Sequence, residues 1–261
     1  MNNPIVLCYH AVSDSWSAPL SVRPREFERQ IRLLVARGFR GETFTEAVLG
    51  QRDARTVAIT FDDAFRSVFE LAFPILSRAG FRATVFVPSA FVDGNSPMAW
   101  PGIDHWLGGP HEAELRPMSW DQLGRLAEAG WEIGSHTRTH PRLTQLDDES
   151  VAHELAGSRR DCEQGLGGPC RSLAYPYGDH DERIVQAARD AGYAAACSLP
   201  AGWHRPDPLC WPRIGVYHPD HRLRFRLKVS PAVRRLRASR AWALVSILRP
   251  GAGGRPVART S

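Results

Sequence analysis

Short apolar runs alternate with helical patterns along the first 200 residues, and this alternation limits the folds open to the chain. Most of the runs are rich in Val, Ile, Ala and Phe, as strands buried on both faces of a sheet are. They cover residues 4–9, 56–61, 81–87, 131–136, 172–175 and 193–198. Helices are predicted between them over residues 24–38, 65–79, 119–130, 147–164 and 181–191. This order predicts an α/β fold with a mostly parallel sheet.

The net charge of +5 is unevenly distributed along the 261 residues. Residues 221–261 contain eleven Lys and Arg and no Asp or Glu, which leaves 22 basic against 28 acidic residues in residues 1–220. We therefore expect a folded domain over 1–220 and a basic tail over 221–261. In the tail, an amphipathic helix capped by Ser230 would place arginines beside Val233, Leu236 and Trp242.

Such a tail suits an anionic membrane surface. A solvated terminus and a helix docked on the domain are the alternatives. Nucleic acid is not an expected partner, because the domain is acidic and no recognition motif is present.

No membrane-spanning or secretory segment is predicted. The longest apolar stretch, residues 241–248, is far shorter than the roughly 20 residues that cross a bilayer. The opening MNNPIVLCYH has no Lys or Arg before its short apolar run, unlike a signal peptide. We expect a cytoplasmic location, with peripheral contact to the inner face of the membrane. Five scattered cysteines without a CxxC pair argue against a disulfide framework or a zinc ribbon.

Three predicted strands end at an imidazole or a carboxylate, namely at His10, at Asp62 with Asp63, and at His136. Parallel α/β folds gather the carboxyl ends of their strands, so these side chains point to one site. Asp62 and Asp63 repel each other and need a cation to stay ionised, although acidic pairs also begin helices. His136 and His140 would share one face of a helical turn and could bind one metal ion, although this spacing also arises by chance.

These segments resemble the polysaccharide deacetylase family, which is carbohydrate esterase family 4 and is also called the NodB homology domain. TFDD (60–63), HTRTH (136–140) and YPYG (175–178) match its three motifs in order. The resemblance covers roughly residues 4–218. It implies a distorted (β/α) barrel of about seven parallel strands and hydrolytic deacylation of an amino sugar.

The resemblance also implies roles for single residues. Asp63, His136 and His140 would bind one divalent ion, with zinc the default and cobalt, nickel or iron compatible with the same ligands. Asp62 would be the general base. In the third motif, which contains Pro176, the backbone N–H of Tyr177 would stabilise the tetrahedral oxyanion.

The sequence departs from the common family pattern in two places. Ala174 stands where the third motif usually has an arginine that orients the base, and we expect Arg213 to supply that guanidinium unless it is an ordinary surface residue. No L-x-H motif follows residue 198 to provide the general acid. The strand LCYHAV instead resembles a permuted subgroup, the poly-N-acetylglucosamine deacetylases, and makes His10 the proton donor. His218 is the rival, and a structural role for His10 stays open.

The connection over residues 88–117 is long for a barrel and contains Trp100 and Trp106, whose indole faces could stack on sugar rings or pack locally. The function expected is removal of an N-acetyl or N-formyl group from an amino sugar of a polysaccharide or glycolipid, in cell-surface carbohydrate metabolism. A catalytically inactive carbohydrate-binding protein and a hydrolase of small non-sugar amides are the alternatives.

Overall fold

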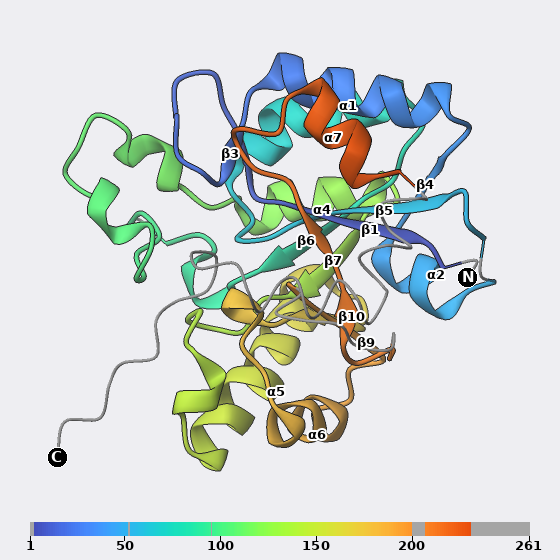
Figure 1. The fold of residues 1–261 in the computed structure, drawn as a ribbon. Coiled ribbons are helices and arrows are strands. Elements are labelled where there is room, and N and C mark those ends of the chain that lie inside the picture. The colour runs from blue at the N-terminus through green and yellow to red at the C-terminus, as the bar shows by residue number, and fades with distance from the viewer. Residues whose placement is uncertain (1–2, 52, 95, 200–206, 231–261) are drawn as a thin grey trace, which may run out of the picture.

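A ring of parallel strands forms the centre of the computed structural model, which describes residues 3–51, 53–94, 96–199 and 207–230 (Figure 1). The order of hydrogen-bonded strands is β10-β9-β8-β7-β6-β5-β1-β11. Their bounds are β1 (Ile5–Tyr9), β5 (Thr56–Phe61), β6 (Thr84–Val87), β7 (Glu132–Ser135), β8 (Ser172–Ala174), β9 (Ala195–Ser198), β10 (Trp211–Pro212) and β11 (Ile214–Gly215).

One extended segment joins the two ends of this order. β10 pairs with β9 and β11 pairs with β1, and Arg213 alone separates β10 from β11. The segment therefore occupies a single position in the ring, and the barrel has seven strand positions. The predicted (β/α) barrel is confirmed.

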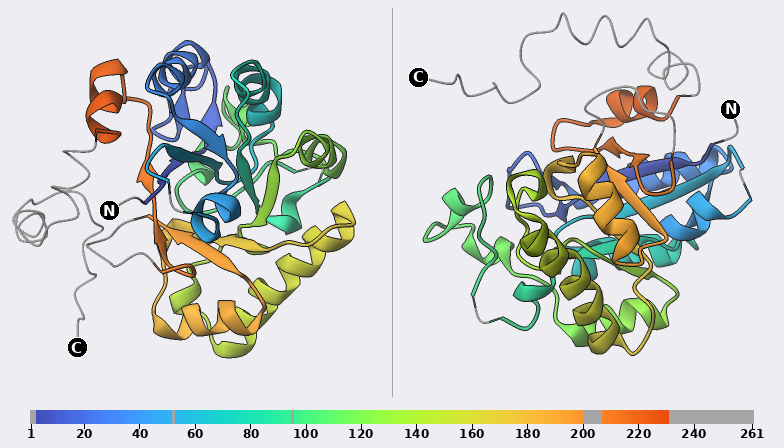
Figure 2. Two further views of the ribbon diagram at one scale, coloured as in Figure 1. Left: turned by 90° about the vertical axis from the view of Figure 1, so that its right-hand side faces the viewer. Right: turned by 90° about the horizontal axis from the view of Figure 1, so that it is seen from below.

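Helices surround the ring, as the left view of Figure 2 shows along the barrel. The bounds are α1 (Pro24–Ala36), α3 (Phe73–Arg78), α4 (Trp120–Glu128), α5 (Asp148–Leu166), α6 (Glu182–Asp190) and α7 (Arg222–Lys228). The helix predicted over 65–79 includes a π-helix, η1 (Val68–Ala72), directly before α3. Pro74, which has no backbone N–H to donate, lies just after this wider turn.

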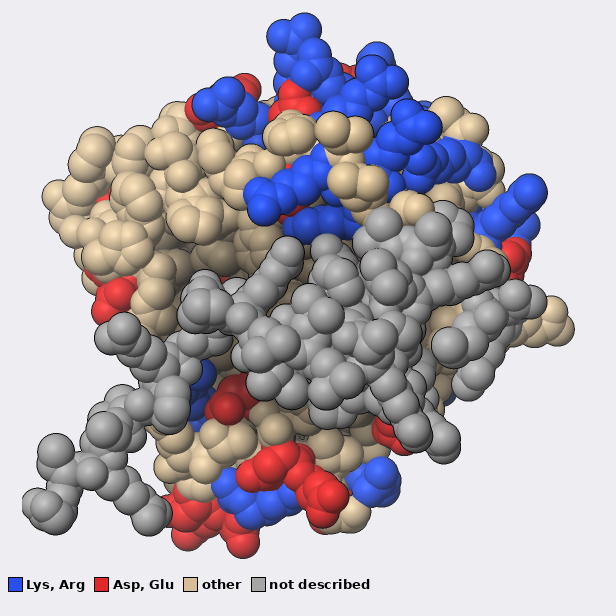
Figure 3. All heavy atoms as spheres, viewed as in Figure 1, with Lys and Arg blue, Asp and Glu red and all other residues tan. Residues whose placement is uncertain are grey.

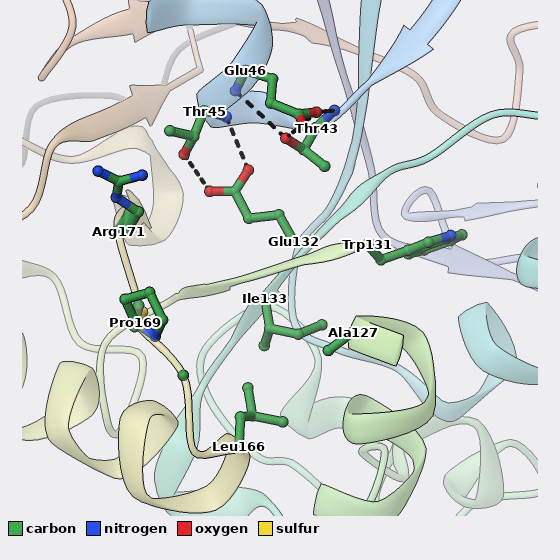
Figure 4. A pocket seen from close by; sticks show the side chains of 12 residues that line it. Thr43, Thr45, Glu46, Ala127, Trp131, Glu132, Ile133, Leu166, Pro169 and Arg171 are labelled. Carbon is green, nitrogen blue, oxygen red and sulfur yellow. Dashed lines mark hydrogen bonds between the residues drawn. The ribbon is translucent and has the colours of Figure 1, made fainter. Parts of the chain in front are cut away.

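A short helix, α2 (Phe44–Leu49), packs at the end of the barrel where the strands begin, and the sequence did not predict it. Phe44 and Val48 belong to one apolar cluster with Val6 and Phe86 from the strands. Glu132 is the first residue of β7. Its carboxylate accepts hydrogen bonds from the backbone N–H and the hydroxyl of Thr45 of α2. Figure 4 shows these bonds in a pocket of about 320 Å³ at this end. Thr45, Thr84 and Ser172 thus all donate hydrogen bonds to the carboxylate of Glu132.

Several other short elements were not predicted. They are β2 (Ala11–Val12), β3 (Ser21–Val22), β4 (Arg40–Glu42), η2 (Ser89–Phe91), η3 (Asp104–Trp106), η4 (Glu112–Leu115), η5 (Leu143–Gln145) and η6 (Pro176–Gly178). Most have two or three residues, too few to show a periodicity. η2, η3 and η4 lie in the long connection over 88–117, which is therefore folded in its described residues.

α7 packs against α1, and Phe225 and Val229 are buried in the main core. The first residues of the predicted basic tail thus contact the barrel, and the division of the chain at residue 220 stays a prediction. The amphipathic helix predicted from Ser230 onward lies outside the described residues. Within the part of the chain that the structure describes, no helix has the length and apolar character to cross a membrane.

Strand register brings the polar strand ends together. Tyr9 pairs with Phe61, so His10 and Asp62 leave neighbouring strands at the same level. Val87 pairs with Ser135, and the backbone N–H of His136 continues this ladder by donating to the carbonyl of Val87. The carboxyl ends of β1, β5 and β7 therefore place these side chains at one end of the barrel.

Candidate active site

Asp63, His136 and His140 form a buried cluster suited to a metal ion. The Nε2 atoms of both histidines lie 3.5 Å from Oδ1 of Asp63. Ligands at about 2.1 Å in tetrahedral geometry around zinc are about 3.4 Å apart. Oδ1 of Asp63 is buried without a hydrogen-bond partner, as a carboxylate oxygen reserved for a cation would be. The donor set and its spacing fit one divalent ion.

The backbone of β8 orients His136. Its Nδ1 lies 2.7 Å from the carbonyl oxygen of Ala174, which accepts the N–H of that nitrogen. The Nε2 lone pair then faces Asp63, the arrangement that commonly holds a metal-binding imidazole in place. The position where the family arginine is missing thus still supports the site through its main chain.

His140 reaches the cluster from a loop. Residues 136–140 do not form the helical turn expected from their spacing, because Thr137 and His140 have left-handed backbone conformations, with φ of 65° and 61°. The rings of His136 and His140 nevertheless lie 4.8 Å apart. The predicted pair is brought together by a strained turn.

Glu154 of α5 holds this turn, and the sequence analysis missed it. Its carboxylate accepts the backbone N–H groups of Arg138 and Thr139 at 2.7 and 2.9 Å and the hydroxyl of Thr139 at 2.7 Å. The side chain is buried. In sequence, Glu154 is one of several acidic residues in a polar helix, so no local pattern distinguishes it.

Asp62 and Arg213 form a two-pronged ion pair. Nη1 and Nη2 of Arg213 donate to the two carboxylate oxygens at 2.6 and 2.7 Å, and Nη1 also donates to Oγ1 of Thr60. Arg213 is only 1% exposed, which excludes the surface role left open above. Burial raises the pKa of Asp62, but Arg213, His136 and His10 outweigh it and leave that pKa well below its usual range. Asp62 is therefore ionised at neutral pH.

His10 also lies near Asp62, with Nε2 4.0 Å from Oδ2. Burial lowers the pKa of His10 to about 4 against the attraction of Asp62, so its imidazole is neutral at pH 7. The rival, His218, is half-buried and hydrogen-bonded through Nδ1 to the carbonyl of Ser21. The structure thus brings His10 to the predicted base, whereas His218 is hydrogen-bonded to β3, the strand before α1.

Burial also sets the charge state of the metal-binding cluster. It lowers the pKa values of His136 and His140, which favours the neutral imidazoles that bind metals. Burial, together with the charge of Asp62, raises the pKa of Asp63. A cation at this position would favour the ionised carboxylate.

The third motif forms η6 beside the cluster. Tyr177 has φ of 59°, and its ring meets that of His140 edge to face at 4.7 Å. Its hydroxyl donates to the carbonyl of Pro101, and the guanidinium of Arg142 lies 4.3 Å from its ring centre. Pro176 is buried. Tyr177 therefore joins the third motif to the long connection over 88–117.

The two tryptophans of that connection differ in position. Trp100 is only 6% exposed and stacks on the ring of His140 at 4.2 Å. Trp106 is half-buried, with its ring edge to face with those of Trp16 and His111. Trp100 supports a predicted metal ligand, whereas a sugar contact by either indole stays a prediction.

The family model for polysaccharide deacetylases matches residues 50–196. The match includes both aspartates, the two histidines and the third motif. The chain belongs to the polysaccharide deacetylase family. His10 and Arg213 lie outside the matched segment.

Known relatives extend the likeness to most of the chain. This chain is 28% identical over 200 residues to the poly-beta-1,6-N-acetyl-D-glucosamine N-deacetylase of Staphylococcus epidermidis, and the match covers 72% of this chain. The match spans 64% of the length of that curated relative. The solved structure of IcaB from Ammonifex degensii is 26% identical, with a TM-score of 0.69, over 87% of this chain and 97% of that one.

A more distant structure supports the fold alone. The Streptococcus pyogenes deacetylase PplD, solved in complex with acetate, is 19% identical and superimposes with a TM-score of 0.72. The superposition covers 87% of this chain and 98% of that one. The barrel is therefore shared well beyond the range of clear sequence similarity.

Proposed function

We propose that this polysaccharide deacetylase family member removes an N-acetyl or N-formyl group from an amino sugar of a polysaccharide or glycolipid, in cell-surface carbohydrate metabolism. The observation that carries the proposal is the Asp62–Arg213 ion pair beside the Asp63, His136 and His140 cluster. An ionised, oriented base next to a metal-binding cluster suits the metal-assisted hydrolysis of an amide. The name of the staphylococcal relative favours an N-acetylglucosamine glycan as the substrate class.

Asp63, His136 and His140 would hold one divalent ion, with zinc the default and cobalt, nickel or iron compatible with the same donors. When bound, such an ion lowers the pKa of water and polarises the amide carbonyl. With one carboxylate and two neutral imidazoles as its protein donors, such an ion could also bind water and the amide carbonyl oxygen.

The chain's own groups would move the protons. Asp62 takes a proton from water while the water oxygen bonds to the amide carbon. Arg213 keeps the Asp62 carboxylate oriented. The backbone N–H of Tyr177 donates to the oxyanion that forms. The C–N bond then breaks, and His10 gives a proton to the leaving amine. The products are the free amino sugar and acetate or formate.

The pKa of His10 adds a condition to this scheme. Because burial keeps the imidazole neutral before reaction, the proton that it delivers must reach it during the catalytic cycle. Oδ2 of Asp62, 4.0 Å away, is the nearby source. We infer that the proton removed from water passes from Asp62 through His10 to the amine.

Acetate release from β-1,6-linked N-acetylglucosamine oligomers, followed by the mass of the sugar product, tests the function. The zinc-loaded protein is expected to release acetate and leave free amines. Oligomer binding without acetate would indicate an inactive carbohydrate-binding protein. Release of acetate from small aromatic amides alone would indicate a non-sugar amidase.

A paired substitution tests the acid. His10→Ala is expected to lose about 10²- to 10⁴-fold in kcat, the range of general acid catalysis, while His218→Ala keeps most activity. The reverse result would assign the acid to His218. The cytoplasmic location and the membrane contact of the tail remain predictions.

A further inference from the structure

α7 presents two leucines and several basic residues on the outside of the barrel. Leu223 and Leu227, one turn apart, are 61% and 51% exposed, whereas Phe225 between them is buried. Arg222, Arg224 and Arg226 are exposed beside these leucines, and α7 contains no Asp or Glu. The helix therefore shows an apolar ridge lined by cationic side chains.

α1 lies next to α7 and extends this surface. Figure 3 shows Lys and Arg gathered over these two helices at the top of the molecule. A pocket of about 330 Å³ between them is lined by Glu26, Arg29, His221, Arg222, Leu223 and Arg226, with Glu26 paired to Arg29. Here the α1/α7 face denotes eight exposed residues, Arg25, Arg29, Arg32, Arg222, Leu223, Arg224, Arg226 and Leu227.

We propose that the α1/α7 face docks on the surface of an anionic lipid bilayer. Leu223 and Leu227 would enter the boundary between headgroups and acyl chains, and the surrounding arginines would contact lipid phosphates. The pocket between the helices offers a place for one headgroup. The proposal rests on the proposed function only for its purpose, which is to hold the enzyme near a membrane-bound glycan.

Charge complementarity favours this occupant over others. The face has six arginines, of which Arg29 and Arg32 pair with Glu26 and Glu28 of α1 and Arg224 pairs with Asp220. Six arginines against three carboxylates leave the face positively charged. The sequence after Ser230 contains seven arginines and no acidic residue, so the tail has the same sign as the face. A second copy would repel it for the same reason. Nucleic acid matches the charge but leaves the two leucines without an apolar environment.

The face also has a suitable position relative to the active site. β11 ends at Gly215 at the end of the barrel that holds Asp62, and the chain then turns into α7 through residues 216–221. Figure 1 shows α7 alongside the barrel, not across that end. A docked enzyme would keep its active site open beside the membrane.

Cosedimentation of the full chain with phosphatidylcholine vesicles, with and without 30% phosphatidylglycerol, tests the proposal. We expect binding to the anionic vesicles only. Arg222→Gln with Arg226→Gln should weaken it about 25-fold, at about fivefold for each arginine near an anionic surface. Leu223→Ser with Leu227→Ser should weaken it about tenfold through the lost apolar burial.

Two full-chain controls separate the face from other charges. Arg160→Gln with Arg171→Gln removes two exposed arginines elsewhere and should bind like the unaltered chain. Replacing the tail residues Arg234, Arg235, Arg237 and Arg240 with Gln should leave binding that still depends on Leu223 and Leu227. The proposal is overturned if the α7 variants bind normally, or if the chain binds DNA oligonucleotides but no vesicle. Acetate release from soluble oligomers should stay unchanged in all variants, so a failed assay of function would be seen separately.

Discussion

Arg213 donates hydrogen bonds to both carboxylate oxygens of Asp62, although the two residues are 151 positions apart in the chain. The contact follows from how the barrel closes. Arg213 separates β10 from β11, so its position is fixed by pairing with β9 on one side and with β1 on the other. Asp62 follows β5, the neighbour of β1. The segment that closes the ring therefore also orients the proposed base.

Replacing Arg213 is expected to damage both stability and activity. Arg213→Met leaves Asp62 buried and unpaired, which should cost about 3–5 kcal/mol in the free energy of unfolding. Urea unfolding measures this cost. Arg213→Lys keeps the charge but not the two-pronged geometry. It should be more stable than Arg213→Met but should still have a low catalytic rate. Unaltered stability in Arg213→Met would show that the ion pair is not held in solution.

Each metal-binding residue should be needed for full metal occupancy. Asp63→Ala, His136→Ala and His140→Ala each leave two of three protein ligands, so the zinc bound after dialysis is expected to fall sharply. Elemental analysis of the purified variants measures it, with His105→Ala, an exposed histidine, as the control. Full occupancy in any of the three variants would remove that residue from the metal site.

Glu154 is expected to tune metal affinity without touching the ion. Glu154→Gln weakens the hydrogen bonds that hold residues 138 and 139, so the turn that carries His140 should loosen. Residues that orient metal ligands typically contribute 10- to 100-fold in affinity. Competition with a zinc chelator gives the value, and Glu149→Gln, exposed on the same helix, is the matched control. Equal affinities in the two variants would make Glu154 a purely structural residue.

The buried, neutral His10 should make the metal-free protein less stable in acid. Its pKa is about 4 when folded, against 6.5 for an ordinary histidine, so between these values the unfolded chain binds a proton that the folded chain does not. Stability from this group is complete above pH 6.5 and is lost as the pH falls toward 4. Between pH 7 and pH 5 the loss is about 2 kcal/mol.

Urea unfolding of the metal-free protein at the two pH values measures the loss. His10→Gln should lose about 2 kcal/mol less than the unaltered chain on acidification. Parallel losses in both proteins would show that His10 is not held neutral by burial.

Much of the fold was predictable because strand burial and helix periodicity agree along the chain. The strand over residues 56–61 was predicted where the structure has it, and the helix predicted over residues 119–130 corresponds to α4. The short strands β10 and β11 were not predicted, because two residues are too few to show a periodicity. Their positions depend on pairing with β9 and β1 at the two ends of the ring.

The candidate site was predictable where its residues follow strands. Asp62, Asp63 and His136 stand next to apolar runs, so sequence alone indicates that they meet. Ala174 belongs to the same apolar cluster as Phe86, and the Arg213 guanidinium lies 5.6 Å from the ring centre of Phe86. Glu154 could not be predicted, because its role depends on a loop whose shape no pattern specifies.

The central claim is that Asp62 is an ionised base beside a metal ion, and Asp62→Asn tests it most directly. The variant keeps the shape of the side chain and all three proposed metal ligands but cannot accept a proton. The measurement is the rate of acetate release from N-acetylglucosamine oligomers by the zinc-loaded variant, with its zinc content determined in the same sample. We predict full zinc content and a rate lower by about 10²- to 10⁴-fold. A zinc-loaded Asp62→Asn protein that releases acetate at the rate of the unaltered chain would contradict the account.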